Sequence, residues 1–461
     1  MSTESEAGQH EEVQEIRVAL DPLLVAAYRL GGDDADVVTV DLTGAEDHLH
    51  EEDRQALDSL PTDLGNRIVF GQLQETNRVR VSTTMDHDSG ALPRDEGSAA
   101  VGNRELLAHY DTILADKYVS WVSEFRFKRR LGAGGQGVVY LTETRGHDDF
   151  AFPVALKVFS PERFRDARDY EETMHRNAHV AARVAQIHHE NLLDVHKFVH
   201  RDRIRMMIME FIDGYDLRRL LVSSLLAGVK GRVSNRRWEY INRVIITDGP
   251  EQPRLKAGVA VDIIRDCLSA LAELHRADIV HGDIKPSNIM LKRTGTAKII
   301  DMGSAFEWNV LPRQLNFTLA YAAPEVIEHR VCTPQSDLAS LGYVLVELLS
   351  GRALFAGATD ERHLLEVKRS LPRRLDEIFP DEVRRSDVLM TFCRRLIAPD
   401  PTRRFASAEE ADLQPNEGAS AFHFQLVRGN LASVFHNDLR IWIEAVKEWD
   451  ETRGMLTEGR E

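Results

Sequence analysis

The sequence predicts an α+β fold in which a strand-rich part is followed by a mostly helical part. Residues 121–215 hold several short apolar runs that are typical of strands, together with one helical pattern. Residues 257–411 instead repeat apolar side chains at helical spacing. Of the 461 residues, 43% are hydrophobic and 29% are charged, which is typical of a globular chain that can bury a sizeable core.

An acidic segment, residues 1–115, precedes this region. Residues 1–116 contain 25 Asp and Glu against 8 Lys and Arg, whereas the rest of the chain is nearly neutral. A helical pattern over 21–32 and strand patterns over 67–73 and 78–84 predict a small α+β accessory module. A partly disordered acidic tail is the alternative. We expect this segment to bind a regulatory partner.

Two further segments flank or interrupt the helical part. Residues 226–256 break the helical rhythm and indicate an insertion, and residues 412–461 form an extension with a final helix expected over 429–451. Three arginines of the insertion are expected either to form a solvated face or to bind an acidic partner. They are Arg232, Arg236 and Arg237.

Several classes of protein are disfavoured by composition. Apolar runs stay far below the roughly 20 residues that cross a bilayer, so no membrane span is expected. The region outside the acidic segment has no basic excess, which argues against a nucleic-acid partner. The first residues are acidic, unlike a secretory signal, and we expect a cytoplasmic protein. Its sparse cysteines, Cys267, Cys332 and Cys393, are expected to be reduced and buried.

A glycine-rich stretch, LGAGGQGVVY, occupies residues 131–140. Its glycines allow a hairpin backbone to approach polyphosphate closely, because no Cβ shields the amides. A strand pattern follows where a dinucleotide-binding fold would need a helix. A plain glycine-rich turn is the alternative reading for the motif alone. The candidate nucleotide-binding residues of this stretch are Leu131, Gly132, Gly134, Gly137 and Val139.

Polar residues with complementary chemistry follow at three places. Lys157 lies within the apolar strand FPVALKVF, where an ammonium either reaches solvent at a sheet edge or meets a buried anion. HGDIKPSNIML, residues 281–291, places Asp283, Lys285 and Asn288 in one turn, and Asp301 follows the strand pattern AKII. Phosphoryl transfer needs a carboxylate for the hydroxyl, a cation and oxygen ligands for Mg²⁺. The alternative, for each residue taken singly, is that Asp283 forms an Asx-turn, that Asn288 is a structural amide and that Asp301 caps a helix.

From about residue 121 to 411 the chain resembles the eukaryotic-type (Hanks-type) serine/threonine protein kinase family. The resemblance implies a two-lobed fold, with a β-rich N-lobe over 121–211 and a helical C-lobe over 212–411. The motifs stand in the family's order: the glycine loop, VALK, MEFIDGYDL (209–217), HGDIKPSN, DMG, AAPE (322–325), SDLASLG (336–342) and DPTRRF (400–405).

The resemblance also implies a reaction and its residues. The γ-phosphoryl group of Mg-ATP would pass to Ser or Thr hydroxyls of a protein, since the D-x-K-x-x-N pattern is that of the serine/threonine class. Catalytic roles would fall to Asp283, Lys285, Lys157, Asn288 and Thr318, with Asn288 and Asp301 holding Mg²⁺. The nucleotide would contact the glycine loop, Ala155, Lys157, Met209, Glu210, Ile212, Asp216, Met290 and Asp301. Glu325 and Arg404 would form a buried ion pair, and Asp337 would brace the catalytic loop.

The pattern departs from the family at the activation segment and at the first helix. Gly282 replaces the arginine of H-R-D, and residues 304–317 hold one hydroxyl, Ser304, so we expect no need for activation-loop phosphorylation. Met302 replaces the phenylalanine of D-F-G. The expected helix glutamate falls on Val180, and the best substitute is Glu172, with Glu171 next or none at all. A nucleotide-binding pseudokinase scaffold and a kinase-fold enzyme with a non-protein substrate remain the alternatives.

Overall fold

The computed structural model describes residues 37–41, 78–84, 104–115, 118–119, 125–146, 148, 150–310, 314–432 and 434–458. They fall into two compact units. The smaller unit contains a three-stranded sheet in the order β1-β2-β17, formed by Val37–Asp41, Arg78–Thr84 and Gln314–Thr318. The predicted strand over 78–84 is confirmed, whereas the patterns over 21–32 and 67–73 lie outside the described residues.

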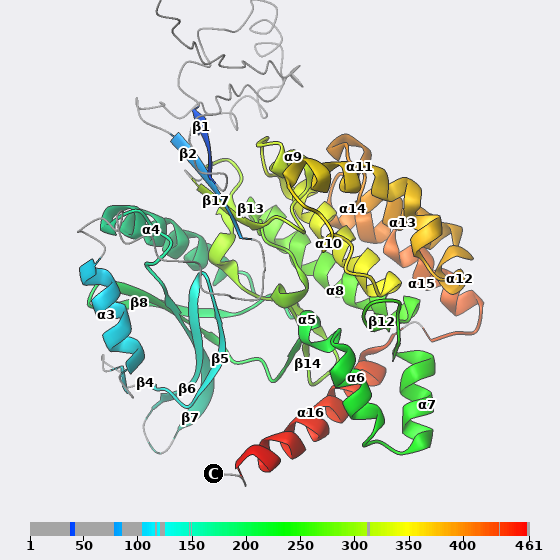
Figure 1. Cartoon of the computed structure of the whole chain (residues 1–461), viewed down its shortest axis with the longest axis horizontal. Coiled ribbons are helices and arrows are strands. Elements are labelled where there is room, and N and C mark those ends of the chain that lie inside the picture. Colours follow the sequence, from blue (N-terminus) through cyan, green and yellow to red (C-terminus); the bar gives the residue numbers. More distant parts are fainter. Residues whose placement is uncertain are drawn as a thin grey trace, which may run out of the picture. The chain divides into compact units, whose positions relative to one another are not determined.

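The larger unit contains a strand-rich lobe and a helical lobe in the predicted order (Figure 1). The strand-rich lobe is built on a five-stranded antiparallel sheet, and its central strand β7 is buried from Val154 to Phe159. In sheet order the strands are β5 (Arg129–Gly134), β6 (Gly137–Arg145), β7 (Ala151–Phe159), β9 (Ile204–Glu210) and β8 (Val195–Arg201). The lobe also includes α3 (Arg104–Ala115), β3 (Tyr118–Val119) and β4 (Phe125–Arg126).

Helix α4 (Ala167–Val184) accompanies this sheet. It begins at Asp166, whose side chain accepts a hydrogen bond from the Asp169 amide over 2.8 Å and so caps the first turn. Residues at helical spacing along α4, among them Tyr170, Met174 and Ala181, are buried. Helix α4 therefore presents one apolar face to the lobe and leaves its polar residues on the other faces.

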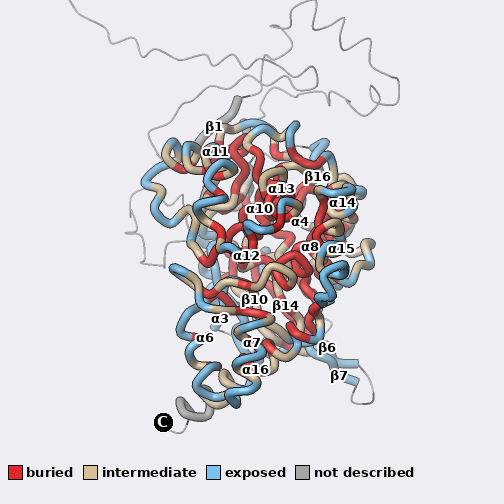
Figure 2. The backbone as a smooth tube through the Cα atoms, turned by 90° about the vertical axis from the view of Figure 1, so that its right-hand side faces the viewer, coloured by how far each residue is buried: buried red, intermediate tan, exposed pale blue. Residues whose placement is uncertain are grey.

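The helical lobe is centred on α8 (Ala257–Arg276) and α10 (Pro334–Ser350), which Figure 2 shows as largely buried. Helix α10 begins with a reciprocal cap between Thr333 and Ser336 and ends at Gly351, which has φ +65°. The helices around this centre include α5 (Leu217–Leu220), α9 (Pro324–Ile327), α11 (Glu361–Ile378), α12 (Asp381–Arg384), α13 (Asp387–Leu396) and α14 (Ala408–Leu413).

Short strands near the junction of the two lobes position the polar motifs. β10 (Gly214–Asp216), β14 (Ile289–Lys292) and β15 (Ala297–Ile299) form one small antiparallel sheet, in which Asp216 pairs with Met290. β13 (Ile279–Val280) pairs with β16 (Phe306–Glu307). These two pairings bring the segments before and after the HGDIKPSN motif alongside each other.

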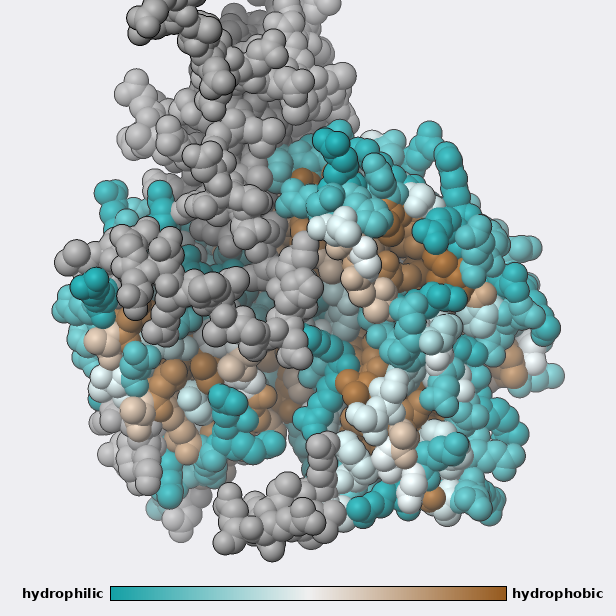
Figure 3. All heavy atoms as spheres, viewed as in Figure 1, coloured by the Kyte–Doolittle hydropathy of each residue, from teal (hydrophilic) through white to brown (hydrophobic). Residues whose placement is uncertain are grey.

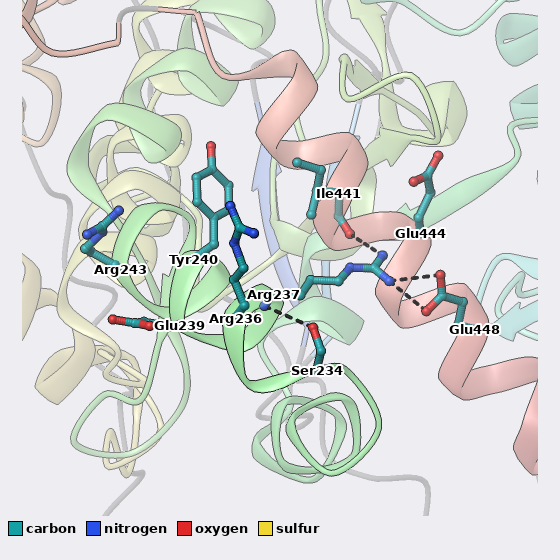
Figure 4. Close-up of a pocket in the computed structure, with 9 residues that line it drawn as sticks. All are labelled: Ser234, Arg236, Arg237, Glu239, Tyr240, Arg243, Ile441, Glu444 and Glu448. Atoms are coloured by element: carbon teal, nitrogen blue, oxygen red, sulfur yellow. Dashed lines mark hydrogen bonds and ion pairs between the residues drawn. The ribbon is translucent and has the colours of Figure 1, made fainter.

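The insertion and the C-terminal extension pack together (Figure 4). The insertion region contains α6 (Ser223–Lys230), α7 (Asn235–Val244), β11 (Ile246–Thr247) and β12 (Arg254–Leu255), and α16 (His436–Glu458) crosses α6 and α7. Arg237 reaches both carboxylate oxygens of Glu448, at 2.9 and 3.0 Å, beside a cavity of about 700 Å³. Arg237 is therefore partnered by the C-terminal extension.

The prediction of a single terminal helix over 429–451 was wrong at its start. A separate helix, α15 (Ala419–Arg428), comes first, and α16 begins only at His436. Gly429 and Asn430 separate them, and Asn430 has φ +55°, which is incompatible with a continuing right-handed helix. Trp442 of α16 is fully buried, so this helix belongs to the core of the larger unit.

The surface and the thiols agree with the composition. In Figure 3 the helical lobe presents mainly hydrophilic residues with separated apolar patches. Among the described residues, no helix combines the length and apolarity that spanning a bilayer requires. The three cysteines are buried, as predicted, and form no disulfide, and burial raises the pKa of each thiol; they are Cys267, Cys332 and Cys393.

A first prediction concerns the buried ion pair of the helical lobe. Glu325 and Arg404 are each 3% exposed and share two hydrogen bonds of 2.6 and 2.7 Å. Arg404→Met leaves the Glu325 carboxylate buried without its cation, and should lower the free energy of unfolding by about 3–5 kcal/mol. Denaturant unfolding measures the change.

Arg403→Met is the matched control. The Arg403 side chain is 81% exposed, so its loss should change stability by less than about 0.5 kcal/mol. Equal stability of the two variants would contradict a structural role for the Glu325–Arg404 pair.

Candidate active site

The carboxylate of Asp283 lies at the centre of a hydrogen-bonded cluster. Asp283 is 8% exposed, and its Oδ1 accepts the amide of Thr318 over 2.9 Å. Its Oδ2 lies 3.0 Å from the Lys285 ammonium, which in turn donates to Thr318 Oγ1 over 2.6 Å. The structure thus brings together a carboxylate, a cation and a hydroxyl that are up to 35 residues apart in sequence.

Asn288 completes this cluster from the end of the 3₁₀ turn Pro286–Asn288. Its Nδ2 donates to the Asp283 carbonyl over 2.8 Å and to Asp283 Oδ2 over 3.2 Å. The amide oxygen of Asn288 accepts no hydrogen bond from the described residues. It is therefore available to an external cation.

Asp337 holds the loop before Asp283. It is 1% exposed, and its two oxygens accept the amides of His281 and Gly282, each over 2.9 Å. His275 Nε2 lies 2.9 Å from Oδ2 of the same carboxylate. Three groups from two segments thus converge on one carboxylate, which fixes the backbone that carries Asp283.

Asp301 has a left-handed backbone, with φ +65°, and caps the 3₁₀ turn Met302–Ser304. Its Oδ1 accepts the Gly303 amide over 3.0 Å and the Lys157 ammonium over 2.5 Å. Desolvation by burial opposes ionisation, but the attraction of Lys157, these hydrogen bonds and the Lys285 ammonium together lower the pKa of Asp301 to about 2. Asp301 is therefore an anion at neutral pH, and in the described part of the chain its Oδ2 accepts no hydrogen bond.

Lys157 is 4% exposed on β7, opposite Val139 of β6 and Met207 of β9. Its ammonium is hydrogen-bonded to Asp301 and, over 2.6 Å, to the side-chain oxygen of Gln136. Among the described residues, no carboxylate of α4 reaches it. Lys157 therefore takes its polar partners from the glycine loop and the DMG motif.

Both candidate substitutes for the helix glutamate have other partners, so of the alternatives that the sequence left open the structure favours none at all. Glu172 accepts from Arg168 one turn earlier over 2.8 Å, and Glu171 accepts from Arg203 over 2.9 Å. Both lie on polar faces of α4, whereas Val180 is 5% exposed on the buried face. Glu172 therefore pairs with Arg168 of its own helix and not with Lys157.

The glycine loop is the hairpin between β5 and β6, closed by the pair Gly134 and Gly137. Gly137 has φ +137°, and a Cβ there would lie 1.9 Å from the carbonyl oxygen of Val158, so only glycine fits. A Cβ at Gly132 or Gly134 would meet nothing within 4 Å, which means that open space adjoins the loop backbone. Leu131 beside it is 36% exposed.

The residues expected around a nucleotide base lie on strands of both lobes, apart from Ile212, which follows β9. Ala155 and Met209 pair across β7 and β9, and Val139 lies on the adjoining strand β6. Ile212 is 9% exposed, and Met290 on β14 is half-buried. These apolar residues come from the three inner strands of the five-stranded sheet, from the segment after β9 and from β14.

The remaining two expected contacts are already partly engaged. Asp216 caps α5 by accepting the Arg219 amide over 3.0 Å, and desolvation raises the pKa of its carboxyl group. The Glu210 amide donates to the Asp194 carbonyl over 3.0 Å, so Glu210 has only its carbonyl to offer at the hinge. Its carboxylate is ion-paired with Lys298.

Two residues of the site, Gln136 and Glu307, were missed by sequence reasoning. Gln136 connects the glycine loop to Lys157 and, through Nε2, to Ser304 Oγ over 3.1 Å. Glu307 of β16 is ion-paired with Arg183 of α4 at 2.7 Å and lies 3.1 Å from His179. The signal for the second contact was present, because His179 and Arg183 share one face of α4 with a four-residue spacing.

The donor set suits a hard divalent cation and a polyphosphate. Asn288 Oδ1 and Asp301 Oδ2 accept no hydrogen bond from the residues that the structure describes, and such oxygen atoms are the ligand type that Mg²⁺ prefers. Lys157, Lys285 and the open backbone of the glycine loop provide positive charge and amides for phosphate oxygens. The residues present therefore fit Mg-ATP.

Comparisons with known proteins agree with this arrangement. A family model described as protein kinase domain matches residues 125–414. The chain is 29% identical over 300 residues to serine/threonine-protein kinase PrkC of Bacillus subtilis, covering 63% of this chain and 40% of that protein. It is also 29% identical over 305 residues to PknJ of Mycobacterium tuberculosis, covering 62% of this chain and 44% of the relative. The match thus spans less than half the length of these relatives.

The brace at Asp337 gives a second prediction. Asp337→Asn replaces one acceptor oxygen by an NH₂ group that faces a backbone N–H or His275, so a buried donor loses its partner. The variant should lose about 1–3 kcal/mol of stability.

The kcat of Asp337→Asn should also fall because the loop that carries Asp283 is displaced. Unfolding and steady-state assays test both effects, with Asp376→Asn at a 61% exposed side chain as the control. An unchanged kcat would contradict the brace.

Proposed function

The chain belongs to the protein kinase domain family, and from this premise we propose that it transfers the γ-phosphoryl group of Mg-ATP to Ser or Thr hydroxyls of proteins. The observation that carries the proposal is the cluster of Asp283, Lys285 and Thr318, each within 3.0 Å of the next. It sets a proton acceptor beside a cation, and the same cation attracts Asp301, the partner of Lys157. Relatives named serine/threonine-protein kinases support the same reaction class.

In this mechanism each side chain has one task. The Asp283 carboxylate orients the attacking hydroxyl and accepts its proton, while Lys285 stabilises negative charge on the transferring group. Thr318 keeps both in place through its amide and hydroxyl. Lys157 holds the α- and β-phosphates. Asn288 and Asp301 would hold Mg²⁺, which would supply charge neutralisation for the phosphates.

We propose in addition that the activation segment needs no phosphate. At Gly282, φ is +74°, and a Cβ would lie 3.2 Å from the Ser304 carbonyl oxygen, so an arginine there would crowd the segment. The segment carries its own anion, Glu307, which is paired with Arg183 and His179 of α4. Arg183 also donates to the Ala277 carbonyl, so the carboxylate and the guanidinium link α4 to the start of the segment.

One observation favours a nucleotide-binding scaffold as the second candidate. Lys157 lacks a carboxylate partner from α4 in the described residues, which is the ion pair that the family uses in catalysis. The two functions differ in a direct test. Incubation with γ-labelled and α-labelled ATP, followed by mass analysis, should show label transfer from the γ position only. Stabilisation by Mg-ATP without any transfer would establish the scaffold instead.

The third prediction concerns Asp283. Asp283→Asn removes the proton acceptor but keeps the shape, so transfer should fall by at least about a hundredfold. ATP affinity, measured by calorimetry, should change less than about threefold, since Asp283 is not assigned to the nucleotide. Asp381→Asn, at a 71% exposed side chain, is the control. Transfer at the wild-type rate by Asp283→Asn would refute the assignment.

The fourth prediction concerns Glu307. The protein should be active when mass spectrometry finds no phosphate on residues 304–317. The Ser304→Ala variant, which has no hydroxyl in this segment, should be active as well. Glu307→Gln should lower kcat by about tenfold, because α4 loses its ionic link to the segment.

Glu172→Gln provides the matched control for Glu307→Gln. It removes the ion pair with Arg168 on the same helix and should leave kcat unchanged. Activity that appears only after phosphorylation of the segment would contradict the proposal, whatever the effect of Glu307→Gln.

A further inference from the structure

The proposed mechanism does not say which groups hold the buried ammonium of Lys157 in place. An ammonium that is 4% exposed needs strong polar partners, because burial removes its hydration. The family places a helix glutamate there, but the corresponding position by count is Val180. In the described residues the oxygen partners of Lys157 are Asp301 and Gln136, and the ring of Phe159 lies 5.2 Å away.

Gln136 is held in a defined orientation at the tip of the glycine loop. Its Oε1 accepts from Lys157 over 2.6 Å, and its Nε2 donates to Ser304 Oγ over 3.1 Å. Its own backbone carbonyl accepts the Ser160 amide over 3.1 Å. The two ends of the carboxamide therefore have different partners, which sets the amide orientation.

The side chain also packs directly on the DMG turn. A Cβ at Gly303 would lie 2.2 Å from Gln136 Oε1, so the carboxamide occupies the space above this glycine. Contacts with Lys157 on one side and with Gly303 and Ser304 on the other place Gln136 between the sheet and the turn that carries Asp301. The glycine loop is thereby tied down at its tip.

We propose that Gln136 is a positioning residue that takes over the part of the missing helix carboxylate, holding Lys157 toward the phosphates of ATP. The proposal rests on the proposed function, since it assigns a role within the same nucleotide site. A neutral acceptor has a consequence for charge. Asp301 balances Lys157, and Gln136 adds a hydrogen bond without a second negative charge, so more of the positive potential of Lys157 remains for the nucleotide.

The element that supplies the partner of Lys157 decides which movements can displace the ammonium. A helix glutamate would make the position of Lys157 depend on α4, whereas Gln136 makes it depend on the glycine loop. Helix α4 approaches the DMG turn through a weak contact, Asn177 Nδ2 to the Gly303 carbonyl at 3.5 Å, and through Glu307. Movement of α4 should then affect the activation segment more than it affects Lys157.

The experiment, our fifth prediction, compares two substitutions at Gln136. Gln136→Met keeps the length but removes the acceptor, and Gln136→Glu keeps an acceptor for Lys157. Because a hydrogen bond to a charged group is lost, Gln136→Met should weaken Mg-ATP binding by about tenfold or more and raise the KM for ATP accordingly, with a smaller change in kcat. Gln136→Glu should retain most of the affinity. Gln186→Met, at an exposed glutamine, is the control.

A second readout does not depend on catalysis. Without nucleotide, an amine-acylating reagent modifies Lys157 to an extent that mass spectrometry can follow over pH. The extent of this modification should differ from wild type in Gln136→Met and stay near wild type in Gln136→Glu. Equal ATP affinity and equal labelling in Gln136→Met and wild type would overturn the proposal. So would tighter ATP binding by Gln136→Met, because Gln136 would then be a cap that ATP must displace.

The two proposals fail separately in this design. Calorimetry and labelling report on Lys157 even in a protein that transfers no phosphate, so loss of the kinase proposal leaves the Gln136 result readable. Conversely, if the wild type transfers γ-label, Asp283→Asn does not, and Gln136→Met resembles wild type throughout, the enzyme function stands and the role of Gln136 falls.

Discussion

The ion pair between Lys157 and Asp301 joins the strand-rich lobe to the helical lobe, and the geometry of the whole site depends on it. The two residues are 144 positions apart, and their contact places the end of β15 against the centre of the sheet. Because the ammonium is buried, neither group can leave the other without a large desolvation cost. The junction is therefore stabilised by the same charges that would meet Mg-ATP.

Other charges in the larger unit follow the same rule of local compensation. Asp283 is balanced by Lys285 and two N–H donors, and Asp337 by backbone amides and His275. Glu325 and Arg404 neutralise each other in the core of the helical lobe. The groups to which we assign catalytic roles are thus held by neighbours that are themselves fixed, which is the preorganisation that phosphoryl transfer requires.

The C-terminal extension attaches beside Asp216, one of the residues proposed to contact the nucleotide. Lys447 of α16 lies 3.1 Å from Asp213, and Asp450 pairs with Arg219 of α5 at 2.5 Å, beside the capping residue Asp216. The C-terminal extension thereby supports the segment that links the two lobes. Glu307 gives the activation segment a permanent anion, and Gln136 gives Lys157 a partner from the glycine loop.

The sequence by itself determined the order of the lobes, the strand that carries Lys157, and the turns that carry Asp283, Asn288 and Asp301. These depend on local patterns: apolar runs, glycines that a hairpin requires, and polar residues grouped within a few positions. It also identified Glu325 and Arg404 as partners through the resemblance. Motif spacing was enough for each of these inferences.

Only the tertiary structure decided that Lys157 meets Gln136, that Glu307 meets Arg183, and that α16 begins at His436 and packs on the insertion. The physical reason is that these contacts join segments far apart in the chain, where several polar partners of similar chemistry compete. Glu172 was plausible on spacing alone, but in the structure it pairs with Arg168 on the preceding turn of α4. Packing, which no local pattern encodes, selected among them.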